Sequence, residues 1–201
     1  YAGLGEPQKA LDFYNQALPF MRILGNKAGE ATTLNNIGWV YDELGEKQKA
    51  LSFYNQALPI LRVIGDKGGE ATILNNIGLV YAALGEPQKA LGFYNQALPI
   101  LHVVGDKVVE ATTLNNIGGV YDALGEKARA LEYYEQALPL LRHVGDKGGE
   151  ATTLNNLGMV YDALGEKQDA LGYYNQALLL LRQVGDKAGE ATTLNNIGLV
   201  Y

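Results

Sequence analysis

The sequence predicts an all-α protein, an α-solenoid of stacked antiparallel helix hairpins. The chain repeats itself with a period of 40 residues, apolar residues recur at helical spacing within each period, and glycines separate the helical segments. A single hairpin cannot bury its own apolar faces, whereas a stack of hairpins forms one continuous core. We therefore expect an array in which each unit packs only against its neighbours.

The repeat is marked by the stretch LNNIG, which recurs with one change, LNNLG at Leu154. With Ala31 as repeat position 1, we expect a single array over residues 1–201. Its parts are a partial unit at 1–30, full units at 31–70, 71–110, 111–150 and 151–190, and a partial unit at 191–201.

The first helix of each unit, helix A, is predicted by one apolar face and by a terminating glycine, Gly45. Asp66 is expected to cap the next helix A with its side-chain oxygen. Gly38 costs about 1 kcal/mol relative to alanine in mid-helix, and we expect a close approach to the small Ala50 to offset that cost. In unit 31–70 the face consists of Leu34, Ile37, Gly38 and Tyr41.

The second helix, helix B, is predicted between Gly45 and Gly65. Pro7 and Pro87 suit its first position, where the backbone N–H has no intrahelical partner. Interior prolines at 19, 59, 99 and 139 should each kink helix B, and Leu179 at the same repeat position should leave the fifth one straighter. The apolar face in unit 31–70 consists of Ala50, Leu51, Tyr54, Ala57, Leu58 and Leu61.

Composition excludes several classes of function. The chain has 47% apolar and 19% charged residues, as a folded soluble protein has, and no cysteine for a disulfide or a zinc site. This fits a reducing cytoplasm, which is where we expect the protein. A net charge of −6 without a basic stripe argues against nucleic acid, and apolar runs far shorter than about 20 residues argue against a membrane span.

An enzymatic function is not expected. The two histidines, His102 and His143, occupy different repeat positions in different units. No nucleophile–base pair, metal-ligand cluster or phosphate-binding loop is present in the sequence, so we expect no cofactor and no metal. The sequence contains no signal peptide, and its first residue is Tyr1 instead of Met, so we expect a fragment of a longer protein.

Seven residues of each unit resemble the tetratricopeptide repeat signature over the whole chain. Two features depart from this signature. Leu34 occupies the position where the signature usually has tryptophan, and the unit has 40 residues instead of about 34. The longer unit, with GDKxGEA or a close variant of it leading each helix A, is similar to the arrays of Partner-of-Inscuteable scaffolds and, more distantly, of kinesin light chains. The seven residues in unit 31–70 are Leu34, Ile37, Gly38, Tyr41, Ala50, Tyr54 and Ala57.

This resemblance implies a right-handed superhelix whose concave groove, lined by helices A, accepts an extended peptide or a partner helix. Helix geometry also places the paired asparagines away from the core of their own hairpin. An amide side chain offers both a donor and an acceptor to a peptide backbone. The candidate peptide-binding amides are Asn35, Asn36, Asn75, Asn76, Asn115, Asn116, Asn155 and Asn156. In the alternative, Asn36 bridges neighbouring helices and Asn35 is merely solvated.

Two further positions are candidates for the same groove. Trp39, Leu79 and Met159 stand at the position where the units differ most, and an exposed row of such residues would form an apolar floor. The alternative is that they fill gaps between helices. Asp42, Asp122 and Asp162 oppose the helix dipole in the last turn of helix A and could attract a basic peptide. Ala82 at that position favours a solvated face instead.

The best interpretation is a scaffold that binds a protein or peptide partner in the concave groove. The alternative is a structural rod or spacer that self-associates head to tail, because both ends of the sequence fall inside a helix A and carry no polar capping face.

Overall fold

The protein is all-α, as predicted. The structure, a computed structural model, describes residues 6–201 and forms ten helices within them, with no strand. Five are B helices: α1 (Pro7–Ile23), α3 (Lys47–Ile64), α5 (Pro87–Val104), α7 (Lys127–Val144) and α9 (Lys167–Val184). Five are A helices: α2 (Lys27–Glu43), α4 (Lys67–Ala83), α6 (Lys107–Ala123), α8 (Lys147–Ala163) and α10 (Lys187–Val200).

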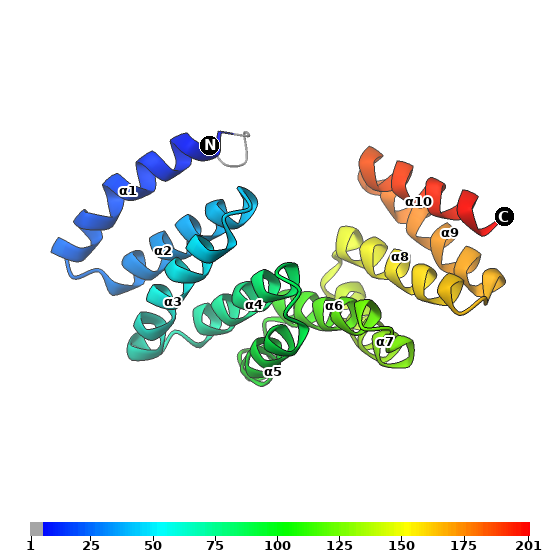
Figure 1. The fold of residues 1–201 in the computed structure, drawn as a ribbon, viewed down its shortest axis with the longest axis horizontal. Helices are drawn as coiled ribbons and strands as arrows, with labels where there is room; N and C mark the ends of the chain where they lie inside the picture. Colours follow the sequence, from blue (N-terminus) through cyan, green and yellow to red (C-terminus); the bar gives the residue numbers. More distant parts are fainter. Residues whose placement is uncertain (1–5) are drawn as a thin grey trace. The chain divides into compact units, whose positions relative to one another are not determined.

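The chain divides into two compact parts, each larger than one 40-residue repeat. We call them the first unit, Tyr1–Val104 with α1–α5, and the second unit, Gly105–Tyr201 with α6–α10. In the first unit α2 packs against α3 and α4 against α5; in the second α6 packs against α7 and α8 against α9. Figure 1 shows these hairpins within each unit. Each B helix also contacts the next A helix of its own unit, so each unit is a short solenoid of stacked hairpins.

Glycine turns and acidic or amide caps set the helix boundaries, as the sequence predicts. Gly45 has a φ of 76°, and its N–H donates to the Asp42 carbonyl at 2.9 Å, which closes the end of α2. Asp66 accepts a hydrogen bond from the Gly69 N–H at 2.9 Å and so caps α4. α1 and α5 begin at Pro7 and Pro87.

The predicted core is confirmed. Leu34 and Ile37 of α2 are fully buried, and Tyr41 is half-buried, stacked on the Phe53 ring at 5.4 Å between centroids. All six residues predicted for the apolar face of α3 are buried: Ala50, Leu51, Tyr54, Ala57, Leu58 and Leu61. Helical periodicity found this core because each helix buries one stripe.

The expected partner of Gly38 was wrong. A Cβ on Gly38 would lie 2.7 Å from Cε1 of the Tyr54 ring, so the tyrosine, not the small Ala50, occupies the space that the glycine leaves. Gly38 and Tyr54 both belong to predicted core faces, and they contact each other across the hairpin. The sequence pattern gives the two faces but not the register between the two helices, and the register decides which residues touch.

The interior prolines do not break the B helices. α3 continues through Pro59 to Ile64, and α7 continues through Pro139 to Val144. The predicted kinks at these prolines stay predictions.

Candidate peptide-binding face

Each A helix has a stripe of polar and apolar side chains that faces away from the core of its hairpin. In α2, Thr33 and Val40 are buried, whereas Thr32 and Trp39 are exposed and Asn35 is half-buried. This pattern of burial agrees with helix geometry, which places Thr33 and Val40 on the side of helix A that packs against a neighbouring hairpin. We call the stripe at the repeat positions of Thr32, Asn35, Asn36, Trp39 and Asp42 the A face.

In the first unit the asparagines of neighbouring A helices bond to each other. Asn76 Nδ2 of α4 donates to Asn35 Oδ1 of α2 at 3.1 Å, and Asn35 Nδ2 lies 3.5 Å from Asn36 Oδ1. Asn75 is buried with 5% exposure. The amides at these two repeat positions therefore link one helix hairpin to the next.

The second unit has the same link. Asn156 Nδ2 of α8 donates to Asn115 Oδ1 of α6 at 3.3 Å, and the Thr153 hydroxyl donates to the same oxygen at 3.2 Å. Asn155 Nδ2 donates to the Thr193 hydroxyl oxygen of α10 at 2.7 Å. Asn116, like Asn155, is half-buried. The bridging alternative considered for Asn36 thus describes its equivalents Asn76 and Asn156.

These links leave part of each amide for another molecule. A carboxamide has two N–H donors and an oxygen with two lone pairs, and the link uses one donor of Asn76 and one lone pair of Asn35. Asn155 Oδ1 is buried and has no hydrogen-bond partner among the described residues. Because this oxygen is shielded from solvent, it is not among the groups that a bound molecule could reach.

The apolar row predicted on the A face is exposed in both units. Trp39 and Leu79 of the first unit are 40% and 39% exposed, and Met159 of the second unit is 49% exposed. These side chains lie partly at the surface, in the same stripe as the half-buried asparagines.

The aspartates of the A face are half-buried and two of them have cationic partners. Asp42 accepts from Lys47 Nζ at 2.7 Å, and Asp122 accepts from Lys127 Nζ at 2.6 Å. For Asp162, the lysine at the same repeat position, Lys167, donates instead to the Val200 carbonyl at 2.6 Å. Each lysine starts the following helix B, so the pairs stabilise the turn of the hairpin.

A pocket of about 120 Å³ opens between α2 and α4 beside Asn35. Its floor includes Ile73 and Leu61, and its polar lining includes the Thr32 and Thr72 side chains. Sequence reasoning missed Ile73, although it is the only isoleucine at a position that is otherwise threonine. The pocket could hold one small side chain of a partner.

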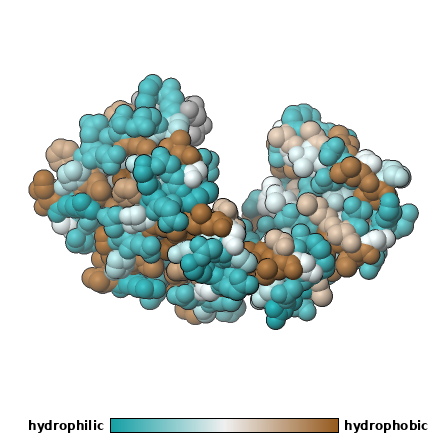
Figure 2. Space-filling view, in the orientation of Figure 1, coloured by the Kyte–Doolittle hydropathy of each residue, from teal (hydrophilic) through white to brown (hydrophobic). Residues whose placement is uncertain are grey.

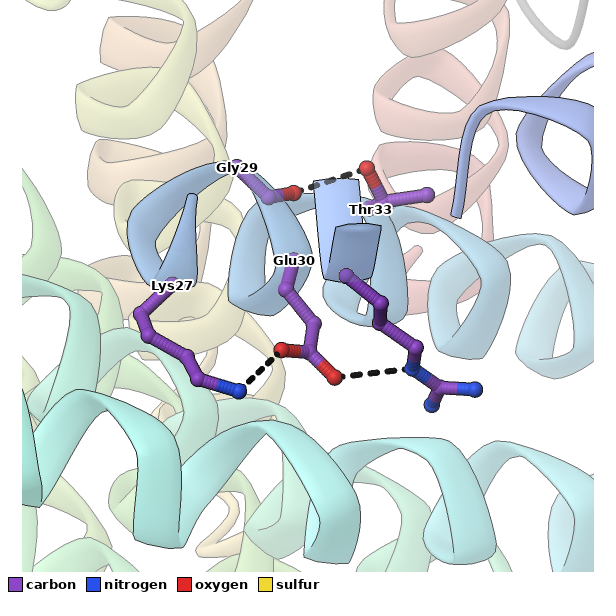
Figure 3. Close-up of polar contacts among 5 residues, drawn as sticks. Lys27, Gly29, Glu30 and Thr33 are labelled. Carbon is purple, nitrogen blue, oxygen red and sulfur yellow. Dashed lines mark hydrogen bonds and ion pairs between the residues drawn. The ribbon is translucent and has the colours of Figure 1, made fainter. Parts of the chain in front are cut away.

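Sequence reasoning also missed an arginine–glutamate ion pair that joins each of four B helices to the next A helix, and at Glu30, Glu70 and Glu190 a lysine completes an ion triad. Glu30, with a side chain only 7% exposed, accepts from Arg22 Nε and from Lys27 Nζ, each at 2.8 Å. Figure 3 shows Lys27 and Glu30 beside the Thr33 hydroxyl, which donates to the Gly29 carbonyl at 2.8 Å. The same arginine–glutamate pair recurs as Arg62–Glu70, Arg142–Glu150 and Arg182–Glu190. The recurring Arg, Lys and Glu positions were a signal that could have found it.

The triads keep their glutamates ionised. Hydrogen bonds from Lys27 and then from Arg22 hold the pKa of Glu30 below its usual range. For Glu70, burial raises the pKa, but hydrogen bonds from Lys67 and Arg62 outweigh it and the net shift is downward. These carboxylates therefore join one helix to the next and stay ionised near neutral pH.

Residues 6–201 offer neither a metal site nor a membrane-spanning helix. No cluster of three or more His, Asp or Glu side chains that could hold a metal ion is present there. Within the same range, no helix is long and apolar enough to cross a membrane.

The fold and the A face together define a helix-hairpin repeat protein. The model of the family described as tetratricopeptide repeat matches residues 1–62, 69–143 and 149–201, so this chain belongs to the tetratricopeptide repeat family. A search of curated proteins found no match.

Solved structures share the fold at low sequence identity. BtubC (BKLC) from P. vanneervenii is 22% identical, with a TM-score of 0.85 over 97% of this chain and 83% of that one. A Podosopora anserina putative kinesin light chain with nearly identical TPR-like repeats is 17% identical, with a TM-score of 0.72 over 92% of this chain and 91% of that one. The predicted resemblance to kinesin-light-chain-like repeats is confirmed at the level of the fold.

A third similar structure is the Rap conjugation gene regulator of the plasmid pLS20 in complex with the Phr* peptide. It is 20% identical, with a TM-score of 0.80 over 94% of this chain. This chain spans 52% of the length of that regulator.

Proposed function

We propose that this chain is a protein-interaction module whose A face binds an extended peptide or a partner helix. The observation that carries the proposal is the combination, on one stripe, of asparagine amides with unused hydrogen-bonding capacity and an exposed apolar row. Neither feature is needed to fill the hairpin core, which other side chains fill.

The chemistry of the stripe suits a peptide backbone. Each backbone N–H or C=O that loses water without a new partner costs about 1–3 kcal/mol. The remaining N–H donor of Asn76 is a group that a backbone C=O could satisfy. Trp39, Leu79 and Met159 would add apolar contacts, and tryptophan is among the most frequent hot-spot residues.

The comparisons support the proposal by analogy. The Rap regulator of pLS20, which shares this fold, was solved in complex with a peptide. The proposal for this chain rests on its own A face, since identities of this size show the fold alone.

The test is to select peptides from a random phage-displayed library against the purified chain and to measure their affinity by fluorescence anisotropy. Trp39→Ala should weaken the selected peptides about tenfold or more, as expected for a central aromatic contact. Leu179→Ala serves as control, because Leu179 is 60% exposed on the B helix α9, away from the A face.

The proposal is contradicted if selected peptides bind the Trp39→Ala and wild-type chains equally and lose affinity with Leu179→Ala. Asn35→Ala and Asn76→Ala separate the two roles of the amides. A lowered melting temperature with unchanged peptide affinity would assign them to the stack alone.

A second candidate function, a self-associating rod, is favoured by the exposed face of α10. A Cβ on Gly198 would meet nothing within 4 Å, whereas Gly158 at the same repeat position abuts the Tyr174 ring. Leu194 is 45% exposed, whereas Leu154 is buried. A second copy of the 201-residue chain could cover this face with its α1, whose sequence matches the B helices that pack on A helices elsewhere. Sedimentation that shows a monomer at every concentration up to about millimolar rules the rod out.

A further inference from the structure

The B helices of the first unit end in a row of exposed aliphatic side chains. Ile23, Val63 and Val103 occupy one repeat position in α1, α3 and α5, and they are 81%, 86% and 86% exposed. The second unit has His143 and Gln183 at that position. Because the second unit forms the same hairpins with polar residues at this position, hairpin packing does not require the aliphatic row. We call this row, with its neighbours in the pocket below, the first-unit edge.

A pocket of about 260 Å³ lies in the first-unit edge, lined by Lys27, Pro59, Ile60 and Val63. Three of its residues come from the end of α3 and are apolar, and Lys27 starts α2. Figure 2 shows apolar atoms at the outer margin of this unit, where α1 turns into α2 and where α3 ends. The pocket is therefore apolar with one cation at its border.

In the second unit the lysine at this place has a polar partner. Lys147, the N-terminal lysine of α8, stands at the repeat position of Lys27. Its Nζ donates to Gln183 Oε1 at 3.1 Å. In the first unit the equivalent pair is Lys27 and Val63, and valine offers the ammonium no acceptor. The N-terminal lysine of α8 thus bonds to a side chain of α9, whereas Lys27 bonds to Glu30 of its own helix and lines a pocket with Val63.

The charges at the start of α2 leave one positive charge without a counterpart. Arg22 and Lys27, whose side chains are 50% and 55% exposed, share the single carboxylate of Glu30. The cap of α2 is the neutral Asn26, whereas α4 has the anionic Asp66 in that place. In a chain of net charge −6, this turn therefore carries a local positive charge beside an apolar pocket.

We propose that the first-unit edge docks an acidic amphipathic segment of a partner protein. An aliphatic or aromatic side chain of the segment enters the pocket at Pro59, Ile60 and Val63, and a carboxylate lies beside Lys27 and Arg22. An exposed apolar patch bordered by charge is a usual mark of such an interaction site. One uncompensated charge is too little for an anionic membrane surface, which is recognised by clusters of several Lys and Arg residues. This site lies on helix ends and is separate from the A face.

The test uses the whole chain and a designed fluorescein-labelled peptide that carries Leu and Phe on one helical face and Glu on the other. A second peptide with Lys in place of Glu, and vesicles of phosphatidylserine and phosphatidylcholine, are the competing probes. We expect saturable binding of the acidic peptide that weakens as salt is raised. Val63→Gln, which gives α3 the residue type of Gln183, should weaken binding about tenfold. Lys27→Gln should weaken it about fivefold.

Matched controls exist in the second unit. Lys187→Gln removes the equivalent lysine of α10, which also pairs with a glutamate, Glu190, and it should leave the affinity unchanged. Leu179→Gln changes an exposed leucine of α9 and should also have no effect. Trp39→Ala should leave this affinity unchanged too, so failure of the A-face proposal and failure of this one give different results.

Four results would overturn the proposal: no saturable binding of the acidic peptide, equal binding of the charge-reversed peptide, unchanged affinity in Val63→Gln, or binding to the vesicles without binding to the peptide. All the variants alter exposed side chains, and circular dichroism confirms that each remains folded before its affinity is compared.

Discussion

The glycines of the A helices and the tyrosines of the B helices form one repeated contact. A Cβ added to Gly38, Gly78, Gly118 or Gly158 would lie 2.5–2.7 Å from an atom of a tyrosine ring, closer than real Cβ contacts come. The mid-helix glycine therefore carries a cost of about 1 kcal/mol in helix propensity and in return lets an aromatic ring be buried against the helix.

Gly158→Ala and Gly198→Ala should have opposite effects on stability. The first forces a Cβ to 2.5 Å from Cε1 of Tyr174, and we expect a net loss of about 1–2 kcal/mol. The second meets nothing within 4 Å, and we expect a gain of up to about 1 kcal/mol from helix propensity. Urea denaturation of both variants measures the difference, and equal effects would show that the tyrosine contact is not the reason for the glycine.

Tyr94→Phe should be neutral or stabilising by up to about 1 kcal/mol. The Tyr94 ring is fully buried, and its hydroxyl has no hydrogen-bond partner among the described residues. Removal of an unpaired buried hydroxyl removes a desolvation cost without losing a bond. Thermal unfolding measures the change, and a loss above about 1 kcal/mol would indicate a buried water bound to this hydroxyl.

At the scale of the helices, ion triads join helix B to the next helix A at α1–α2, α3–α4 and α9–α10. Their glutamates lie in the first turn of an A helix, where the helix dipole also favours an anion. In α4 this glutamate is Glu70. The structure adds Arg62 from the preceding helix and Lys67 from the same turn.

The triads predict a loss of stability in acid. The pKa values of Glu30, Glu70 and Glu190 are lowered by folding, so their stabilisation is complete above the unfolded value of about 4.5 and is lost as pH falls through the lower folded values. The melting temperature should therefore fall between about pH 5 and about pH 3. Glu70→Gln should be less stable than wild type at neutral pH and should lose less on acidification. An equal loss in both proteins would contradict this role of the triad.

The helix B prolines give a second prediction at this scale. Pro139→Leu restores a backbone donor inside α7 and should stabilise the chain by up to about 3 kcal/mol. Leu179→Pro in α9, the one B helix that lacks the proline, should destabilise it by a similar amount. Calorimetry of the two variants measures both changes, and a stabilising Leu179→Pro would show that the B helices favour the bend.

At the scale of the whole molecule, each unit has a core of its own. In the second unit one cluster runs through α7, α8 and α9, from Ala130 and Tyr134 to Leu154 and Leu181. A chain divided between Val104 and Gly105 should therefore give two fragments that each keep a helical circular dichroism spectrum and melt cooperatively. A fragment without a cooperative transition would show that its core cannot form alone.

The sequence by itself determined the period, the helix boundaries and the buried stripe of each helix. These features depend on neighbours within one or two helical turns and on turn residues such as Gly45 and Asp66, so periodicity and capping patterns reveal them. The A face also followed, because the buried stripe fixes which side of helix A remains outside.

Only the tertiary structure decided which side chains meet between helices. The contacts of Gly38 with Tyr54, of Asn76 with Asn35 and of Glu30 with Arg22 join residues on different helices. They depend on the axial register and rotation of one helix against another, which packing of whole side-chain surfaces sets and which a repeat pattern leaves open. The same register brings Lys27 and Val63 to one pocket of the first-unit edge, although both residues were visible in the sequence.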